Sequence, residues 1–455
     1  MAVPAIVMTE TFDKARRTLV VGLGKTGLSV ARYLSRQGVP VAIVDSREQP
    51  PELEHSRSEL PADVALFLGG FHKDAFDRAE QIVISPGVSM DEPEIAAALA
   101  RQVPVIGDIE LFAQAARAPV IAVTGSNGKS TVVTLLGAMA RHAGVDVRTG
   151  GNIGTPALDL ITADEPDLYV LELSSFQLET LYSLQPLASV VLNISHDHLD
   201  RYRDLQDYAA AKQAVYKGAV LQVVNLDDKV AVALADEQRP IVGFTEGIPA
   251  GNQYGLLAYA GEIWLARGDV RIMPASGVRM AGLHNLANAL AALALGEAAG
   301  LPQAAMVETL GEFQGLPHRM QYLVEQQGVC WFNDSKGTNV GATLAAIDGV
   351  DGKVVLIAGG DGKGADFSPL AAAMQRKGQG IVLIGKDAPL LEAVLRDVVP
   401  VMHAEDMTQA VQLAAGMAQS GDCVLLSPAC ASTDMYRNFE ERGDVFMQAV
   451  RELVH

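Results

Sequence analysis

The sequence predicts an α/β protein of three domains, because short β-type runs alternate with helical patterns in three successive blocks. This alternation is typical of parallel sheets covered by helices. At 455 residues the chain is also longer than one hydrophobic core usually holds. We place the three domains at residues 1–107, 108–315 and 316–455.

The composition excludes several classes of protein. Apolar residues make up 49% of the chain and charged residues 20%, which is typical of a globular protein. The formal net charge of −19 argues against a nucleic-acid partner, because nucleic-acid binding depends on Lys and Arg that neutralise phosphates. No apolar run approaches the ~20 residues that span a bilayer, so we expect no membrane insertion. Three cysteines without CxxC spacing favour neither disulfides nor a structural zinc, and we expect a cytoplasmic protein.

The first domain opens with a dinucleotide-fold pattern. A strand is expected at Thr18–Val21, followed by the GxGxxG arrangement of Gly22–Gly27 and then a helical stretch. A second expected strand, Val39–Val44, ends at Asp45. The literal interpretation is NAD binding. The alternative is a Rossmann-like fold whose glycine turn serves another nucleotide, because fold does not fix function.

The second domain contains a phosphate-binding loop. The segment TGSNGKST at 124–131 lies between an apolar strand-like run and an apolar helical stretch. Gly125 and Gly128 let backbone N–H groups turn toward phosphate oxygens, and Lys129 adds a positive charge. Ser130 or Thr131 can hold Mg²⁺, so a nucleoside triphosphate is the expected ligand. Val123 stands where the general P-loop has a further glycine, and an ordinary βα turn is the alternative.

Two further strand ends in this domain carry polar side chains. Glu172 ends the expected strand Leu168–Leu173 and suits a Mg²⁺ ligand, or else is a structural acid. The expected strand Ser189–Ile194 leads into a cluster of His196, Asp197 and His198, followed by Asp200. Zinc is a weak interpretation of this cluster, because a third soft ligand at a recognisable spacing is missing.

Candidate ligand groups continue through the rest of the second domain and into the third. Lys212 lies in the helical stretch Leu205–Tyr216, where most lysines are solvated. The junction GLPHR at 315–319 is either a hinge or a phosphate-binding element that ends in a guanidinium. The segments NDSKGTN at 333–339 and GGDGKGAD at 359–366 follow strand-like runs and are either ligand loops or turns.

Together these segments resemble the Mur ligases over essentially the whole chain. The resemblance rests on eight stretches: TGSNGKST, GGNIG at 150–154, LELSSFQLE at 171–179, the His-Asp-His cluster, HNLANALAA at 284–292, GLPHR, NDSKGTN, and SPACASTDMYRNFEERG at 427–443. Within the family, NDSKGTN points to the branch that adds the second amino acid of the peptidoglycan stem. The ligases that add the first or third residue carry different, His-containing loops there.

The resemblance implies a fold and an activity. The expected fold is a Rossmann-like N-terminal domain, a central P-loop ATPase domain and a Rossmann-like C-terminal domain that closes to supply the amino acid. The expected activity is ATP- and Mg²⁺-dependent amide formation through an acyl phosphate, with UDP-N-acetylmuramoyl-L-alanine and D-glutamate as substrates. We expect a monomer.

The resemblance also implies roles for individual residues. Those for ATP are Gly125, Asn127, Gly128, Lys129, Ser130, Thr131, Asn288, Arg319 and Asp334. Those for substrates are Asp45, Ser85, Asn152, Lys336, Thr338, Lys363, Ser432 and Phe439. Those for the metal are Ser130, Glu172, His198 and Lys212, with Lys129, His198 and Lys212 as the catalytic set. Lys212 matches the lysine that this family carbamylates, and His196 has no counterpart and stays unassigned.

Three competing interpretations remain. Folylpolyglutamate synthase shares the ATPase core, but it should lack the N-terminal domain that the GxGxxG block predicts. An NAD-dependent oxidoreductase leaves the GKST loop unexplained. A non-catalytic nucleotide switch is weakened by the candidate ligand loops of the last domain.

Overall fold

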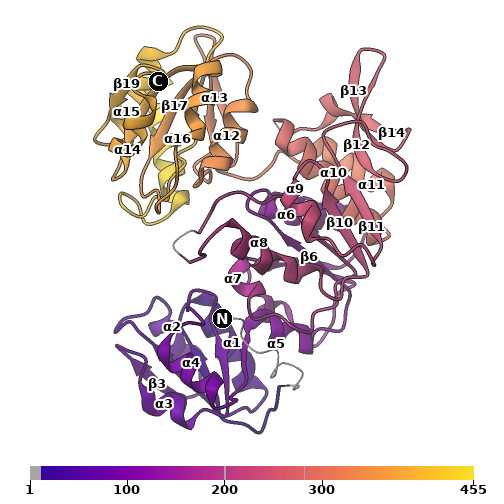
Figure 1. Cartoon of the computed structure of the whole chain (residues 1–455), viewed down its shortest axis with the longest axis vertical. Coiled ribbons are helices and arrows are strands. Elements are labelled where there is room, and N and C mark those ends of the chain that lie inside the picture. The colour runs from indigo at the N-terminus through magenta and orange to yellow at the C-terminus, as the bar shows by residue number, and fades with distance from the viewer. Residues whose placement is uncertain (1–11, 199–200, 281, 455) are drawn as a thin grey trace.

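A computed structural model describes residues 12–198, 201–280 and 282–454. It contains three α/β domains in chain order, as Figure 1 shows from the indigo N-terminal domain to the yellow C-terminal one. The three-domain α/β fold expected from the sequence is confirmed. No helix within the described residues is both long and apolar enough to cross a bilayer.

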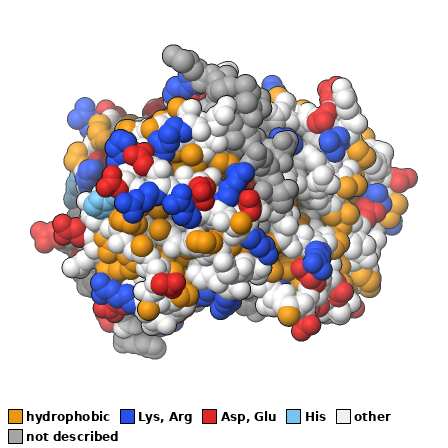
Figure 2. All heavy atoms as spheres, turned by 90° about the horizontal axis from the view of Figure 1, so that it is seen from below, with side chains coloured by type: hydrophobic (Ala, Val, Ile, Leu, Met, Phe, Trp, Pro, Cys, Tyr) orange, Lys and Arg blue, Asp and Glu red, His pale blue; other side chains and the backbone are white. Residues whose placement is uncertain are grey.

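The N-terminal domain is a five-stranded parallel sheet in the order β3-β2-β1-β4-β5. Its strands are β1 (Thr18–Val21), β2 (Val41–Asp45), β3 (Ala65–Leu68), β4 (Gln81–Ile84) and β5 (Val105–Gly107). Its helices are α1 (Lys25–Arg36), α2 (Leu53–Glu59), α3 (Lys73–Arg78) and α4 (Pro93–Ala100). In the view of Figure 2, from below Figure 1, basic and acidic side chains are interspersed among apolar ones.

The central domain is a nine-stranded mixed sheet in the order β14-β13-β12-β11-β10-β9-β6-β8-β7. Its strands are β6 (Val120–Thr124), β7 (Val147–Gly151), β8 (Leu168–Glu172), β9 (Ala188–Val191), β10 (Leu221–Asn225), β11 (Ile241–Phe244), β12 (Tyr254–Tyr259), β13 (Glu262–Arg267) and β14 (Val270–Pro274). Its helices are α5 (Asp108–Ala115), α6 (Lys129–His142), α7 (Ser175–Leu178), α8 (Leu205–Gln213), α9 (Lys229–Leu234), α10 (Leu283–Ala298) and α11 (Gln303–Glu312). Short 3₁₀ helices lie at Ala157–Leu160, Ala214–Tyr216 and Ala275–Gly277. The Ala- and Leu-rich helix α10 packs against α6, and most of its residues are buried, as expected.

The C-terminal domain is a six-stranded sheet in the order β15-β16-β20-β17-β18-β19. Its strands are β15 (Gln321–Gln326), β16 (Val329–Asn333), β17 (Val354–Gly359), β18 (Gly378–Ile384), β19 (Val401–His403) and β20 (Cys423–Leu426). Its helices are α12 (Val340–Asp348), α13 (Pro369–Lys377), α14 (Ala388–Leu395), α15 (Met407–Met417) and α16 (Phe439–Val454). Only the edge strand β15 is antiparallel to its neighbour.

Most expected strands are present with small shifts of their ends. The second strand begins at Val41 instead of Val39 and includes Asp45, and the strand expected at Ser189–Ile194 is Ala188–Val191. The antiparallel strands β12, β13 and β14 were not anticipated. They extend a parallel sheet through two tight hairpins, whereas the sequence pattern suggested only parallel sheets.

The parallel strands bring the candidate ligand segments to one edge of each sheet. The phosphate loop follows β6, Glu172 ends β8 and the His-Asp-His cluster follows β9. In the C-terminal domain, Asp334 follows β16 and Ser427 follows β20. Ligands of open α/β sheets bind at this carboxyl edge, so the fold itself collects the candidate site.

Candidate functional site

The phosphate loop is a tight turn that only glycine can form at one position. Gly128 has φ +85°, and a Cβ there would lie 2.4 Å from Oδ1 of Asn288 in helix α10. The loop is also held by the segment after β9, because the N–H of Ser126 donates to the carbonyl of Asn193 at 2.9 Å. Helix α6 begins at Lys129, so its first N–H groups face the loop. The loop is therefore a preformed anion cradle.

Two cations reach this cradle. Nζ of Lys129 donates to the carbonyls of Gly125 at 2.7 Å and Ser126 at 2.8 Å. Nη2 of Arg319 donates to Oγ of Ser130 at 2.6 Å from the junction with the C-terminal domain. Burial lowers the pKa of both Lys129 and Arg319. Cations that have lost their water gain most from an incoming anion.

A cavity of about 320 Å³ adjoins the loop between the central and C-terminal domains. Its lining includes six of the residues expected to hold ATP: Asn127, Gly128, Thr131, Asn288, Arg319 and Asp334. Oδ2 of Asp334 accepts a hydrogen bond from Oγ of Ser427 at 2.7 Å, and burial raises the pKa of this carboxyl to about 7. Oδ1 of Asp334 accepts from the N–H of Met320 at 3.2 Å, so each oxygen keeps acceptor capacity for a ligand.

A second cavity of about 290 Å³ lies on the other side of the loop and contains a concentration of charged groups. The expected residues that line it are Asn127, Gly128, Lys129, Ser130, Asn152, Glu172, His198, Lys212, Arg319, Lys336, Thr338 and Lys363. Oε1 of Glu172 accepts a hydrogen bond from Nδ2 of Asn152 at 2.8 Å. Oε2 of Glu172 is buried without a hydrogen-bond partner among the described residues. A buried carboxylate oxygen in that state suits a cation.

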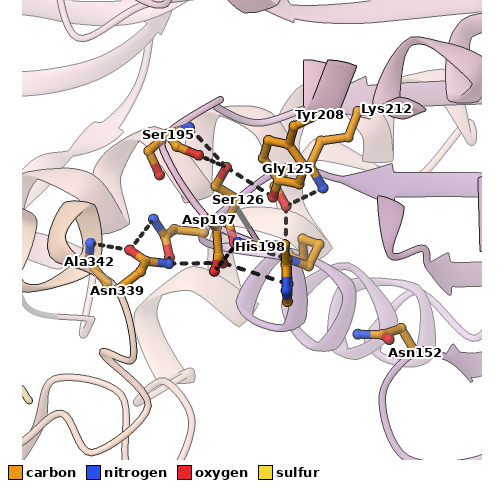
Figure 3. Close-up of polar contacts among 12 residues, drawn as sticks. Gly125, Ser126, Asn152, Ser195, Asp197, His198, Tyr208, Lys212, Asn339 and Ala342 are labelled. Atoms are coloured by element: carbon orange, nitrogen blue, oxygen red, sulfur yellow. Dashed lines mark hydrogen bonds and ion pairs between the residues drawn. The ribbon is translucent and has the colours of Figure 1, made fainter. Parts of the chain in front are cut away.

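Lys212 is fully buried and points at the phosphate loop, as Figure 3 shows. Nζ donates to the carbonyl of Gly125 at 3.0 Å and to Oγ1 of Thr124 at 3.4 Å. Burial, followed by repulsion from Lys129, lowers the pKa of Lys212 well below its usual value. Asp197 and Glu172 attract Lys212 electrostatically, but no carboxylate of the described residues forms an ion pair with it. The ordinary expectation for this helical lysine, a solvated side chain, is therefore wrong.

Tyr208 is a site residue that the sequence reasoning missed. Its ring lies 4.6 Å from Nζ of Lys212, and its hydroxyl accepts from Oγ of Ser126 at 3.3 Å. The signal was its spacing, because residues four apart share one face of a helix and Tyr208 precedes Lys212 by that distance. Tyr208 thus ties the lysine-bearing helix to the phosphate loop (Figure 3).

His198 lies at the rim of the same cavity in a left-handed backbone conformation, with φ +54°. Its ring packs edge-on against Phe176, with centroids 4.8 Å apart, and its Nε2 is 3.8 Å from Oδ2 of Asp197. Asp200 lies outside the described residues. Within the described ranges, no group of three or more His, Cys, Asp or Glu side chains is arranged to hold a metal by itself.

A third cavity, of about 590 Å³, lies between the N-terminal and central domains. Gly22, Asp45 and Ser85 line it from one side, and Asn152 lines it from the other. Both oxygens of Asp45 accept hydrogen bonds from the Arg47 side chain, at 2.8 and 2.7 Å. Burial alone would raise the pKa of Asp45, but the hydrogen bonds from Arg47 and Leu23 outweigh it and lower the pKa. Arg47 thus holds the Asp45 carboxylate in a fixed orientation at this cavity.

The residues expected to bind the amino acid are only partly brought together. Nζ of Lys336 lies 4.0 Å from the ring centroid of Phe439, and burial, with repulsion from Arg319 and Lys129, lowers the pKa of Lys336 to about 8. Lys363 is exposed at the cavity rim with φ +51°. Ser432 is buried and does not line the cavity.

The domains of this chain match known families. The models "Mur ligase MurD-like, N-terminal domain", "Mur ligase middle domain" and "Mur ligase, glutamate ligase domain" match residues 16–107, 123–296 and 318–430. The chain is 56% identical over 442 residues to the UDP-N-acetylmuramoylalanine--D-glutamate ligase of Nitrosococcus oceani, which covers 97% of both chains. It is 49% identical over 439 residues to the ligase of the same name from Pseudomonas aeruginosa, covering 96% of this chain and 98% of the other.

Solved structures show the same fold at low identity. MurF ligase from Thermotoga maritima in complex with ADP gives a TM-score of 0.61 at 16% identity, covering 97% of this chain and 100% of that one. The UDP-N-acetylmuramate-alanine ligase MurC from the same organism gives 0.60 at 19% identity, covering 96% and 100%.

Proposed function

The chain belongs to the Mur ligase family, and from this premise we propose that it joins D-glutamate to UDP-N-acetylmuramoyl-L-alanine while converting ATP to ADP and phosphate. The names of relatives 49–56% identical over nearly the whole chain support this choice of substrates. It is a step in the synthesis of peptidoglycan precursors. The alternatives of an oxidoreductase, a folate ligase and a passive switch are set aside.

One observation carries the proposal: the three cavities form a continuous series through shared residues. Asn152 lines both the cavity beside Asp45 and the charged cavity. Arg319 and Lys336 line both the charged cavity and the cavity beside Asn288. A UDP-linked acceptor, a phosphoryl group and a nucleotide would therefore lie next to one another in that order, which brings the acceptor carboxylate and ATP to the same phosphate loop.

The reaction proceeds in two displacements. A carboxylate oxygen of the acceptor bonds to the γ-phosphorus as the bond to ADP breaks, which gives an acyl phosphate. The amine of D-glutamate then bonds to the acyl carbon, loses a proton, and phosphate leaves with the electrons of the broken C–O bond. Lys129, Arg319 and Lys336 supply positive charge where negative charge concentrates during both steps.

The metal expected by the family is Mg²⁺, and the charged cavity fits it. The fit rests on the unpartnered Oε2 of Glu172 and on oxygen donors such as Ser130. Glu172, Ser130, His198 and Lys212 would hold the ion, which keeps several waters and needs few protein ligands. When bound, it neutralises phosphate charge and orients the phosphate oxygens.

Lys212 is proposed to act as a carbamate. An ammonium would repel Mg²⁺, whereas a carbamate presents anionic oxygens of the kind that Mg²⁺ binds. The neutral amine bonds to the carbon of CO₂ and releases a proton. Burial of Lys212, the lowered pKa and the absence of an ion pair within the described residues all favour the neutral amine.

The remaining roles follow the family pattern as proposals. Asp45, Ser85 and Asn152 are assigned to the UDP-linked substrate, and Lys336 and Thr338 to its reacting end. Lys363, Ser432 and Phe439 are assigned to D-glutamate. Ser432 lies outside the cavity, so its contact would require the C-terminal domain to move. We also propose a monomer that works in the cytoplasm.

A phosphate-release assay tests the proposed function. Purified protein is given ATP, Mg²⁺ and UDP-N-acetylmuramoyl-L-alanine, with D-glutamate, L-glutamate, L-alanine or a diamino acid in separate reactions. We expect turnover only in the reaction that contains D-glutamate. Equal turnover with any other amino acid would refute the substrate assignment.

A further inference from the structure

The Asn339 side chain connects the C-terminal domain to the phosphate loop, because its oxygen and its nitrogen bind different partners. Asn339 precedes helix α12 and is only 7% exposed. Its Oδ1 accepts from the N–H of Ala342 at 2.8 Å, which caps the helix. Its Nδ2 donates to Oδ1 of Asn127 at 3.2 Å and to Oδ2 of Asp197 at 3.3 Å. Figure 3 shows Asn339 between Ala342 and Asp197.

The two contacts of Nδ2 reach functionally different parts of the central domain. Asn127 belongs to the phosphate loop, and Asp197 precedes His198 in the segment that follows β9. Serine or aspartate would cap a helix about equally well. Among common capping side chains, only an asparagine offers an acceptor to the helix and two N–H donors to other partners. The choice of residue is therefore explained by the interdomain contacts and not by the cap.

The packing around Asn339 leaves little room at this contact. A Cβ on Gly341, in the first turn of α12, would lie 3.0 Å from Oγ of Ser195. The helix start is thus seated closely on the segment that leads to Asp197. Lys336 and Thr338 lie just before the same helix and line the charged cavity. A shift of Asn339 would move these two residues relative to the phosphate loop.

We propose that Asn339 is a positioning residue, which locks the start of α12 onto the phosphate loop and so holds Lys336 and Thr338 in register with the bound nucleotide. The proposal rests on the proposed function for its assay. Its physical core is the pairing of an amide donor with the Asp197 carboxylate across the domain boundary. Such a pair can be exchanged between the two positions and remain favourable.

A double-mutant cycle uses this exchange. Asn339→Asp keeps an acceptor for the cap and for Nδ2 of Asn127, which donates to Oδ1 of Asn339 at 3.4 Å, but it loses both donated hydrogen bonds and sets a second carboxylate against Asp197. Two carboxylates at this separation repel each other. Adding Asp197→Asn restores one amide and one carboxylate in reversed order. Asp197→Asn by itself is expected to lower activity because of its place beside His198, so the cycle compares ratios.

The kinetic measurement is kcat/KM for D-glutamate, obtained from the rate of phosphate release. It is made for wild type, the two single variants and the double variant. We expect Asn339→Asp to cost about tenfold in the wild-type background and at most about twofold in the Asp197→Asn background. Equal losses in both backgrounds would overturn the proposal, because a residue that only caps α12 has no reason to depend on Asp197.

Two further measurements keep the test independent of folding and of the assigned reaction. Asn339→Ser retains a cap but cannot reach Asn127 or Asp197, so we expect normal thermal unfolding with reduced kcat/KM. Full activity of this variant would overturn the proposal. Small-angle X-ray scattering should give a larger radius of gyration for Asn339→Asp than for wild type, with reversal in the double variant. An unchanged radius of gyration would overturn the proposed role of Asn339. This outcome does not depend on the substrate: if the wild type used another amino acid, only the proposed function would be refuted.

Discussion

Arg319 donates a hydrogen bond from Nη2 to Oγ of Ser130 over 2.6 Å, although 189 positions separate the two residues in the chain. The guanidinium comes from the GLPHR junction, and the hydroxyl belongs to the first turn of α6. Ser130 is the side chain that a P-loop uses for Mg²⁺. Arg319 therefore occupies the ligand hydroxyl, and a phosphate would give the guanidinium a stronger, charged acceptor.

Replacing Arg319 with lysine should weaken ATP use more than acceptor use. Lysine keeps the charge but loses the planar fork that pairs with phosphate oxygens. We expect KM for ATP to rise about tenfold and KM for UDP-N-acetylmuramoyl-L-alanine to stay within about twofold. Steady-state kinetics with each substrate varied in turn measures both values. A rise confined to the acceptor KM would contradict the placement of Arg319 beside the nucleotide.

Lys363→Ala should impair the use of D-glutamate. Lys363 lies exposed at the rim of the charged cavity, where an ammonium can pair with a substrate carboxylate. We expect KM for D-glutamate to rise about tenfold, with KM for ATP unchanged. Lys353→Ala is the matched control, because Lys353 is also exposed but lies before β17, at the opposite edge of the sheet. Equal effects in the two variants would remove Lys363 from the site.

Asp108→Asn should make the protein more stable at neutral pH. Asp108 begins α5 and is 2% exposed, its Oδ2 accepts from Nε2 of Gln177 at 2.9 Å, and burial raises its pKa from 3.8 to about 6. The folded protein therefore binds this proton more tightly than the unfolded chain does. The free energy of unfolding should fall as the pH rises through this interval.

Asparagine imitates the protonated acid and carries no charge at any of these pH values. We expect the melting temperature of Asp108→Asn to exceed that of wild type at about pH 8 and to match it more nearly at about pH 4. Thermal unfolding followed by circular dichroism across this range measures the difference. A variant less stable than wild type at the higher pH would contradict the assigned cost of the buried charge.

Local sequence patterns were sufficient to predict the fold class and the glycine turn between β6 and α6. Gly22 and Gly128 lie in turns between strands and helices and have positive φ angles, which glycine adopts most readily. Such turns can therefore be predicted from the sequence without knowledge of the tertiary structure. The antiparallel strands β12 to β14 were missed because their sequences alternate between polar and apolar residues over only a few positions. Such short segments resemble loops in composition. Strand ends shifted by up to three residues for the same lack of local signal.

The site was predictable only where a motif names its residues. Lys212 looked like a solvated lysine, and nothing local indicates that helix α8 packs its alanine-flanked face against the phosphate loop. Tyr208 and Asn339 act through contacts with segments far away in the chain, at Ser126 and Asp197. Such pairings arise from the packing of domains, which a single sequence does not display.

Lys212→Ala should abolish most activity, and a small carboxylic acid should restore part of it. The substitution removes the proposed carbamate oxygens and leaves Glu172 as the only anionic candidate ligand named for Mg²⁺ in the charged cavity. Formate or acetate is small enough to enter the vacated space and offers oxygen donors of the same charge. We expect activity at least about 10²-fold below wild type without acid and a concentration-dependent recovery with it. Lys217→Ala is the control, because Lys217 is an exposed lysine just beyond the same helix.

A direct measurement distinguishes the carbamate from a lysine that acts as an amine. Wild-type protein equilibrated with ¹³C-labelled CO₂ should show a carbamate carbon signal in its NMR spectrum that Lys212→Ala lacks. The buried amine can react because desolvation, with repulsion from Lys129, lowers its pKa and increases the neutral fraction. If the wild type shows no such signal, or if Lys212→Ala is fully active, the carbamate is refuted. If acetate restores activity to Lys212→Ala, and this variant lacks the carbamate signal of the wild type, then the wild type has an anionic oxygen ligand at position 212.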